Sequence, residues 1–246
     1  AEYQYRMNLI VDLGNSTTKA AVFDGERMVV RKRLGTSIAD GLAMLAGDFD
    51  IDACAYANVG ADMPRVVSML RQIAPDRLLE VTGMTPTPLI CDYHTPETLG
   101  SDRLAAAVGA ASVCPSTPLL VIDAGTCITY DFVSADAHYL GGSISPGLGM
   151  RLRALHEQTA RLPLVNADGV LPEIGYDTPT AIRIGVLEGM AREIEGYISR
   201  FLRKNAGAKV FLTGGNAYRF AQEMEVERND TLVEIGLNTI LEHTFN

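Results

Sequence analysis

The chain lacks several features that would assign it to a common class of protein. No stretch of about 18 apolar residues occurs, so we expect no transmembrane helix and no membrane partner. No basic run occurs either, and 30 acidic residues outnumber 21 basic ones, which argues against a nucleic-acid partner. Residues 1–6 are polar, and Asn8 and Asp12 interrupt the apolar run that follows, so no secretory signal is visible. We therefore expect a cytoplasmic protein.

Two further absences exclude common kinds of site. The four cysteines, at positions 54, 91, 114 and 127, form no C-x-x-C pair, so we expect small, buried, reduced side chains. Neither G-x-x-x-x-G-K-[ST] nor G-x-G-x-x-G occurs. A nucleotide site in this chain is therefore expected to differ from the P-loop and Rossmann arrangements.

An acidic motif is present twice. Val11–Lys19 contains Asp-x-Gly-Asn followed by hydroxyl side chains, and Val121–Thr129 contains Asp-x-Gly-Thr. In each copy an apolar strand ends in an aspartate, which can hold a cation through water. The glycine that follows lets backbone N–H groups approach phosphate oxygens. The pair indicates two similar half-molecules that bind one metal-bound polyphosphate.

The pattern around these motifs predicts β-hairpins followed by alternating helices and strands, and this order occurs twice. Strands are expected at 7–13, 19–24, 27–34, 53–59, 78–81, 119–123, 129–134, 138–143 and 209–212. Helices are expected at 36–47, 63–73, 101–113, 147–159, 178–205 and 232–243. Residues 82–99, rich in Thr and Pro, should form an irregular functional loop. We predict an α/β protein with domains 1–114 and 115–246 that pack with a cleft.

The order of motifs resembles the acetate and sugar kinase, Hsp70 and actin superfamily. Its members have duplicated ribonuclease-H-like (actin-like ATPase) domains with ATP in a central cleft. Within that superfamily the chain is similar to type III pantothenate kinases over residues 8 to about 240. The motifs are Asp12-x-Gly14-Asn15-Ser16, Gly100-Ser101-Asp102-Arg103, Asp123-x-Gly125-Thr126-x-x-Thr129-x-Asp131, Gly141-Gly142-x-Ile144-x-Pro146-Gly147 and Thr213-Gly214-Gly215. The resemblance implies a homodimer that phosphorylates pantothenate to 4'-phosphopantothenate, the first step of coenzyme A biosynthesis.

For the nucleotide, the resemblance implies two phosphate loops, an adenosine motif and two kinds of cation. Asp12 would contact Mg²⁺ indirectly, and Asp123 would bind a monovalent cation, K⁺ or NH₄⁺. The expected ATP-binding residues are Asp12, Leu13, Gly14, Asn15, Ser16, Thr17, Thr18, Lys19, Thr126, Gly214 and Gly215.

For the acceptor, the resemblance implies that Asp102 is the catalytic base and that Arg103 binds the substrate carboxylate. Transfer to a primary alcohol needs a group that accepts the hydroxyl proton, and a helix N-terminus favours anions nearby. The expected substrate-binding residues are Tyr93, Gly100, Ser101, Asp102, Arg103 and Thr178. Without a ligand, Ser101 and Thr178 would be ordinary helix-capping residues and Tyr93 a half-buried aromatic.

Three other functions fit part of this pattern. A kinase of the same fold could act on another small acceptor, such as a sugar or acetate. A non-catalytic regulator could bind nucleotide or metabolite as a signal, although a pure binder has no need of a base at Asp102. An actin-like or Hsp70-like ATPase module would need subdomain insertions that 246 residues cannot hold.

Overall fold

The computed structural model describes residues 7–220 and 226–245, so the polar start at 1–6 lies outside the described residues. The chain forms two compact units. The first contains the N-terminal part up to Ser116, Val133–Gly141 and the C-terminal part from Thr231. The second contains Thr117–Phe132 and Gly142–Asp230. This division differs from a single boundary after residue 114, because the C-terminal helix belongs to the first unit.

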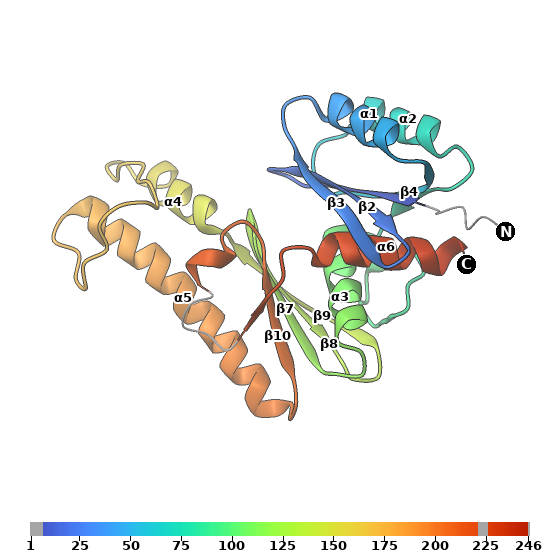
Figure 1. Ribbon diagram of the computed structural model, residues 1–246. Coiled ribbons are helices and arrows are strands. Elements are labelled where there is room, and N and C mark those ends of the chain that lie inside the picture. Colours follow the sequence, from blue (N-terminus) through green and yellow to red (C-terminus); the bar gives the residue numbers. More distant parts are fainter. Residues whose placement is uncertain (1–6, 221–225, 246) are drawn as a thin grey trace. The chain divides into compact units, whose positions relative to one another are not determined.

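The first unit contains a five-stranded sheet with strand order β3-β2-β1-β4-β5. Strands β1, β2 and β3 are antiparallel neighbours, and β4 and β5 continue the sheet parallel to β1. Helices α1 and α2 cover one face of this sheet (Figure 1). The elements are β1 (Met7–Leu13), β2 (Thr18–Asp24), β3 (Arg27–Leu34), α1 (Ile38–Asp48), β4 (Ile51–Asn58), α2 (Pro64–Ile73) and β5 (Leu78–Val81).

Alternation along β1 explains how this sheet is covered on both faces. Leu9, Val11 and Leu13 belong to the core cluster that contains buried residues of α1 and α2. The residues between them point to the other face, because successive strand side chains alternate. On that face the Asn8 amide donates a 2.9 Å hydrogen bond to the Asn238 side chain of helix α6 (Leu232–Phe245). Asp12 therefore shares the face that α6 covers.

Helix α6 packs closely on helix α3 (Ser101–Val113) within the first unit. A Cβ atom added to Gly236 would lie 1.7 Å from the Ala105 carbonyl oxygen, and one on Gly109 would lie 2.0 Å from that of Leu232. Only glycine permits such a close approach of the two backbones. Helix α3 comes after β5 and the loop that follows it, and α6 comes after the last strand, Glu227–Arg228. The two helices therefore occupy equivalent places in the two halves of the sequence.

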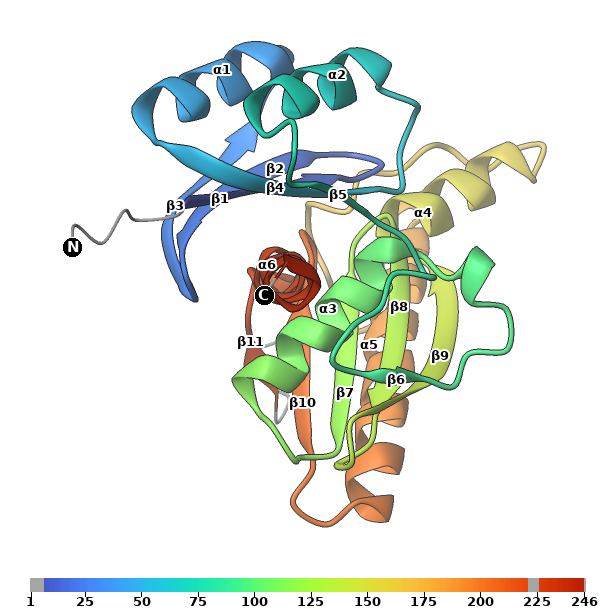
Figure 2. The ribbon, with the colours of Figure 1, turned by 90° about the vertical axis from the view of Figure 1, so that its right-hand side faces the viewer.

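The second sheet repeats the strand order of the first. Its order is β11-β10-β7-β8-β9-β6, so that β9-β8-β7-β10-β11 corresponds to β3-β2-β1-β4-β5 (Figure 2). The expected duplication is therefore confirmed, with β6 as an additional strand beside β9. The strands are β6 (Ile90–Cys91), β7 (Leu119–Ala124), β8 (Cys127–Val133), β9 (His138–Pro146), β10 (Lys209–Thr213) and β11 (Glu227–Arg228).

A long helix covers β7 in the second unit. Helix α5 (Thr178–Lys204) buries residues at helical spacing, among them Val186, Met190 and Ile194, against Leu120 and Ile122 of β7. Helix α4 (Leu148–Glu157) joins the same core. Two short 3₁₀ helices, Pro96–Thr98 and Ala217–Arg219, complete the described elements. Asp123 alternates with the core-facing residues of β7, so it points away from α5.

The predicted helices and strands are confirmed with small shifts at their ends. Strands β6 and β11 were not expected, because two residues are too short to show a period. The expectation of four buried cysteines is wrong for Cys91, which is exposed, while Cys114 and Cys127 are half-buried. Only Cys54 is buried, and that burial raises the pKa of its thiol to about 12. Among the described helices, none is long and apolar enough to cross a membrane.

Candidate active site

The first acidic motif forms the tight turn between β1 and β2. The Gly14 N–H donates to the Thr17 carbonyl at 3.1 Å, and Asn15 and Ser16 at the tip are exposed. Asp12 is buried and stands directly opposite Lys19 in the antiparallel ladder. The Lys19 Nζ lies 3.8 Å from the Asp12 carboxylate. The turn thus combines a buried carboxylate and its lysine with an exposed polar tip.

A glycine outside the expected motifs supports this turn. A Cβ atom on Gly60 would lie 2.9 Å from the Gly14 carbonyl oxygen. The Gly60 N–H donates to Oδ1 of Asn58 at 3.1 Å within the loop after β4. The Val59 N–H donates to the Leu13 carbonyl at 3.1 Å, which holds this loop against the turn. The only sequence signal was the Asn-x-Gly spacing after a strand, which is common in turns.

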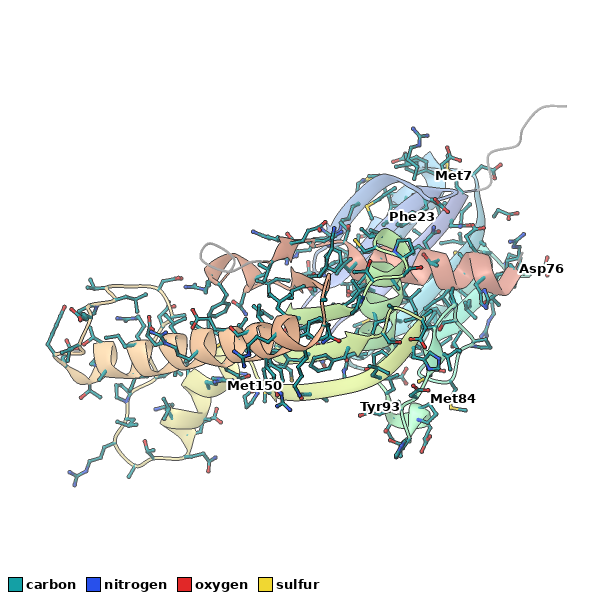
Figure 3. The ribbon with its side chains drawn as sticks, turned by 90° about the horizontal axis from the view of Figure 1, so that it is seen from below. Met7, Phe23, Asp76, Met84, Tyr93 and Met150 are labelled. Carbon is teal, nitrogen blue, oxygen red and sulfur yellow. The ribbon has the colours of Figure 1, made fainter. Side chains whose placement is uncertain are left out.

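The second acidic motif forms a shorter turn between β7 and β8. The Gly125 N–H donates to the Cys127 carbonyl at 2.9 Å, so one residue separates the bonded pair instead of two. Asp123 lies two residues before Gly125, and Thr129 lies two residues after Cys127, so the two stand opposite each other in the ladder. In the first hairpin the same count places Lys19 opposite Asp12. The Cys127 thiol lies 3.9 Å from the sulfur of Met150, which Figure 3 labels.

The second unit brings the adenosine motif against this aspartate. Gly214 has φ +96°, and a Cβ atom there would lie 2.3 Å from Oδ1 of Asp123. A Cβ atom on Gly125 would lie 3.3 Å from the same oxygen. Two glycines therefore pack closely against one carboxylate oxygen, although the motifs are far apart in sequence. Gly215 is exposed beside them.

Gly147 shows why the Gly-rich segment after β8 is needed. Its N–H donates to the Thr126 carbonyl at 3.1 Å, and a Cβ atom there would lie 2.2 Å from that oxygen. The backbone at Gly147 therefore packs directly against the second turn and is hydrogen-bonded to it. Thr126 itself is exposed at the tip of that turn.

Asp102 lies in the first turn of α3. Gly100 is the N-cap of this helix, Ser101 is its buried first residue, and neither provides a side-chain cap. Capping by Ser101 is therefore ruled out. The Asp102 carboxylate accepts the Arg103 N–H at 2.8 Å. Burial raises the pKa of Asp102 above its ordinary value, and the N–H and charge of Arg103 only partly offset this.

Arg103, Tyr93 and Gly141 gather around this helix end in the first unit. The buried Arg103 guanidinium lies 5.8 Å from the centroid of the Tyr93 ring. Gly141 has φ +90°, and a Cβ atom there would lie 3.1 Å from the same ring. Tyr93, which is labelled in Figure 3, comes from the loop between β5 and α3. Gly141 thus provides the space that Tyr93 occupies.

Thr178 differs from the other expected substrate residues. It is the exposed first residue of α5, where Asp177 is the N-cap and forms a capping box with Thr180. The hydrogen bonds of this helix start therefore do not need Thr178. Capping by Thr178 is ruled out, and its contact with substrate stays a prediction.

Protein side chains alone do not form a metal centre in the part of the chain that the structure describes. No group of three or more His, Cys, Asp or Glu side chains there has a metal-binding arrangement. A divalent ion would need oxygen ligands from a bound molecule, as Mg²⁺ commonly has in phosphoryl-transfer enzymes.

Comparison with known proteins gives one consistent family. The family model described as type III pantothenate kinase matches residues 8–200. A type III pantothenate kinase of Bacteroides fragilis is 44% identical over 239 residues, covering 96% of this chain and 98% of that protein. A second, from Porphyromonas gingivalis, is 43% identical over 241 residues and covers 96% and 98%.

Solved structures agree on the fold. A crystal structure described as a Baf family transcriptional activator from Campylobacter jejuni superposes with a TM-score of 0.61 at 22% identity, covering 96% and 98% of the two chains. An N-acetylmannosamine kinase structure from Listeria monocytogenes gives 0.56 at 13%, covering 98% and 100%. The duplicated ribonuclease-H-like fold is thereby confirmed. With a matching family model and relatives of over 40% identity along nearly its whole length, the chain belongs to the type III pantothenate kinase family.

Proposed function

We propose that this protein transfers the γ-phosphoryl group of ATP to the primary hydroxyl of pantothenate, forming 4'-phosphopantothenate for coenzyme A biosynthesis. The observation that carries the proposal is the Asp102 carboxylate at the start of α3, with its raised pKa, beside Arg103. Membership of a pantothenate kinase family supports the choice of acceptor. The family membership also favours this reaction over transfer to a sugar or acetate.

Asp102 accepts the hydroxyl proton in the proposed reaction. The hydroxyl oxygen attacks the γ-phosphorus, the bond from that phosphorus to the bridging oxygen breaks, and ADP leaves with the bonding electrons. A carboxylate whose burial raises its pKa is a stronger base than an ordinary aspartate. The Arg103 N–H, which donates to this carboxylate, fixes its orientation.

Arg103 and Tyr93 form the proposed binding site for the rest of the acceptor, together with Gly100 and Ser101. A guanidinium can bind a carboxylate through two parallel hydrogen bonds, and pantothenate carries one carboxylate. The Tyr93 ring, which lies beside Arg103 and Gly141, would contact the apolar part of pantothenate. Thr178 would add a hydroxyl contact from the start of α5.

The two turns would bind the nucleotide. In the first, backbone N–H groups at Asn15–Thr17 and the charge of Lys19 would bind phosphate oxygens, and Asp12 would hold Mg²⁺ through water. In the second, Thr126 would contact phosphate and Gly214 and Gly215 the adenosine. Bound Mg²⁺ and a monovalent cation would offset phosphate charge.

Asp123 is the proposed ligand of the monovalent cation. Its carboxylate stands opposite a threonine rather than a lysine, and the neighbouring Gly125 and Gly214 lie close to Oδ1. A large, weakly hydrated cation needs several oxygen ligands, so backbone carbonyls would complete the site. The homodimer and the cytoplasmic location that the resemblance implies stay predictions.

The test is an assay of purified protein with ATP, Mg²⁺ and pantothenate, with and without K⁺. The wild-type protein should form ADP and phosphopantothenate in equal amounts. Asp102→Asn should lower kcat by about 100-fold to 10,000-fold, the range of a lost general base. The matched control is Asp62→Asn, which removes an exposed carboxylate of the same unit and should leave kcat unchanged. No product from wild type, or a loss of only a few-fold in Asp102→Asn, would contradict the proposal.

A further inference from the structure

The loop that carries Tyr93 is held to strand β9 at one short place. The Ile90 N–H donates to the Ala137 carbonyl at 2.9 Å, and the Asp92 N–H donates to that of Tyr139 at 3.0 Å. Strand β6 contains only two residues, both exposed, so few contacts stabilise this pairing. Tyr93 follows immediately, and its ring lies near Tyr139 and Gly141 of the same strand.

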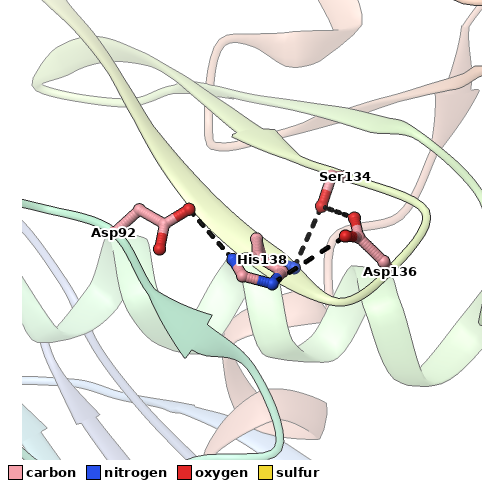
Figure 4. A network of polar contacts seen from close by, with 4 residues as sticks. All are labelled: Asp92, Ser134, Asp136 and His138. Atoms are coloured by element: carbon pink, nitrogen blue, oxygen red, sulfur yellow. Dashed lines mark hydrogen bonds and ion pairs between the residues drawn. The ribbon is translucent and has the colours of Figure 1, made fainter.

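A side-chain contact reinforces this pairing next to Tyr93. The Nδ1 atom of His138 in β9 lies 3.0 Å from Oδ2 of Asp92 (Figure 4). An ionised carboxylate only accepts hydrogen bonds, so Nδ1 must carry the proton in this contact. The contact joins the loop to β9 at Asp92, the residue immediately before Tyr93, whose ring contacts Arg103.

The turn before β9 orients the histidine. The His138 N–H donates to the Ser134 hydroxyl at 3.1 Å, and the same hydroxyl binds the Asp136 carboxylate. Asp136 Oδ2 lies 3.8 Å from Nε2 of His138. The hydrogen bond from Ser134, then the backbone N–H of Asp136 and the charge of His138, lower the pKa of Asp136. The imidazole therefore lies between two carboxylates, one on the loop and one on its own turn.

We propose that Asp92 and His138 are positioning residues that hold Tyr93 in place for the acceptor substrate. This inference rests on the proposed function, because it assigns Tyr93 to the pantothenate site. Neither side chain needs to touch the substrate. The alternation of β9 explains the arrangement, since Tyr139 and Gly141 share the face toward Tyr93 while His138 projects to the other side and reaches Asp92.

The first test separates binding of the acceptor from binding of ATP. His138→Ala and Asp92→Ala should each raise the KM for pantothenate about threefold to tenfold, as expected for the loss of one ordinary hydrogen bond, and leave the KM for ATP unchanged. The double variant should be no worse than either single one, because both remove the same contact. His138→Asn, whose amide N–H stands near the place of Nδ1, should restore most of the wild-type value. Glu97→Gln, which changes an exposed carboxylate of the same loop, is the control and should behave as wild type.

The second test needs no substrate. Amide hydrogen exchange of the segment 86–93 should speed up in His138→Ala and return toward wild type in His138→Asn. Unchanged exchange there, or equal effects on both KM values, would overturn the inference even if wild type phosphorylates pantothenate. Conversely, if His138→Ala speeds up exchange but the wild-type protein does not phosphorylate pantothenate, the contact between the loop and β9 is supported and the proposed function is contradicted.

Discussion

The two acidic hairpins begin alike and differ in what stands opposite the aspartate. Asp12 faces Lys19 across the ladder, whereas the shorter second turn places Thr129 opposite Asp123. Asp12 therefore has a cation from its own hairpin. Gly125 and Gly214 lie close to the Asp123 carboxylate. In the proposed function, the first aspartate is paired with a lysine of the fold and the second binds a cation from solution.

Of the two hairpins, the first should show the larger effect. Asp12→Asn should lower kcat/KM by about 100-fold or more, because the variant loses the proposed contact with Mg²⁺ and leaves Lys19 without its carboxylate. Steady-state assays at several Mg²⁺ concentrations measure this. Asp24→Asn, which removes an acid at the far end of β2, is the control. A loss that K⁺ concentration alone restores would reverse the roles of the two hairpins.

A smaller loss is expected at the second hairpin. Asp123→Asn should lower kcat about tenfold at saturating K⁺, to the rate of wild type without K⁺. The variant should then show no response to added K⁺ or NH₄⁺. A full K⁺ response in Asp123→Asn would mean that the monovalent ion binds elsewhere.

The comparison is sharpest in a variant that makes the second hairpin resemble the first. Thr129→Lys places a lysine opposite Asp123, so its ammonium group should replace part of the charge of the bound ion. We expect the ratio of rates with and without K⁺ to fall about twofold to threefold, since a partly exposed ion pair contributes little. Thr129→Val is the control for the lost hydroxyl. The idea fails if the lysine variant keeps the wild-type ratio.

The smallest expected effect concerns the third carboxylate, on α3 rather than on a hairpin. Because the folded state raises the pKa of Asp102, folding favours its protonated form. This contribution to stability is present below the ordinary pKa and is lost as pH rises through the raised one. Asp102→Asn should therefore have a higher Tm than wild type at pH 7, with the difference shrinking toward pH 4. Thermal unfolding without ligands measures this difference in Tm. A lower Tm for Asp102→Asn than for wild type at pH 7 would contradict the prediction.

The sequence predicted the elements well where apolar periodicity was long. Helix α3 and strands β3 and β5 have the expected ends, and α5 is shorter by one residue. Strands β6 and β11, at the two edges of the second sheet, were missed because two residues show no period. The contact that Gly141 makes could not be predicted from the motif that contains it. In the structure it makes room for Tyr93.

The histidines show the limit of reading motifs. None of the four matched a motif, and His138 acquires its neighbours only because β9 brings it beside a loop that precedes it by more than 40 residues. The same holds for Gly214 and Asp123, which parallel pairing of β10 and β7 places together. Long-range strand pairing of this kind leaves no local pattern.

By itself, the sequence determined the duplicated α/β plan and the two acidic turns, since alternating apolar residues and Asp-x-Gly spacing are local and follow from backbone geometry. Only the tertiary structure decided which residue faces each aspartate, because a turn shorter by one residue changes the register of its ladder. It also decided the burial that raises the pKa of Asp102. Burial depends on packing by residues distant in sequence, which no local pattern records.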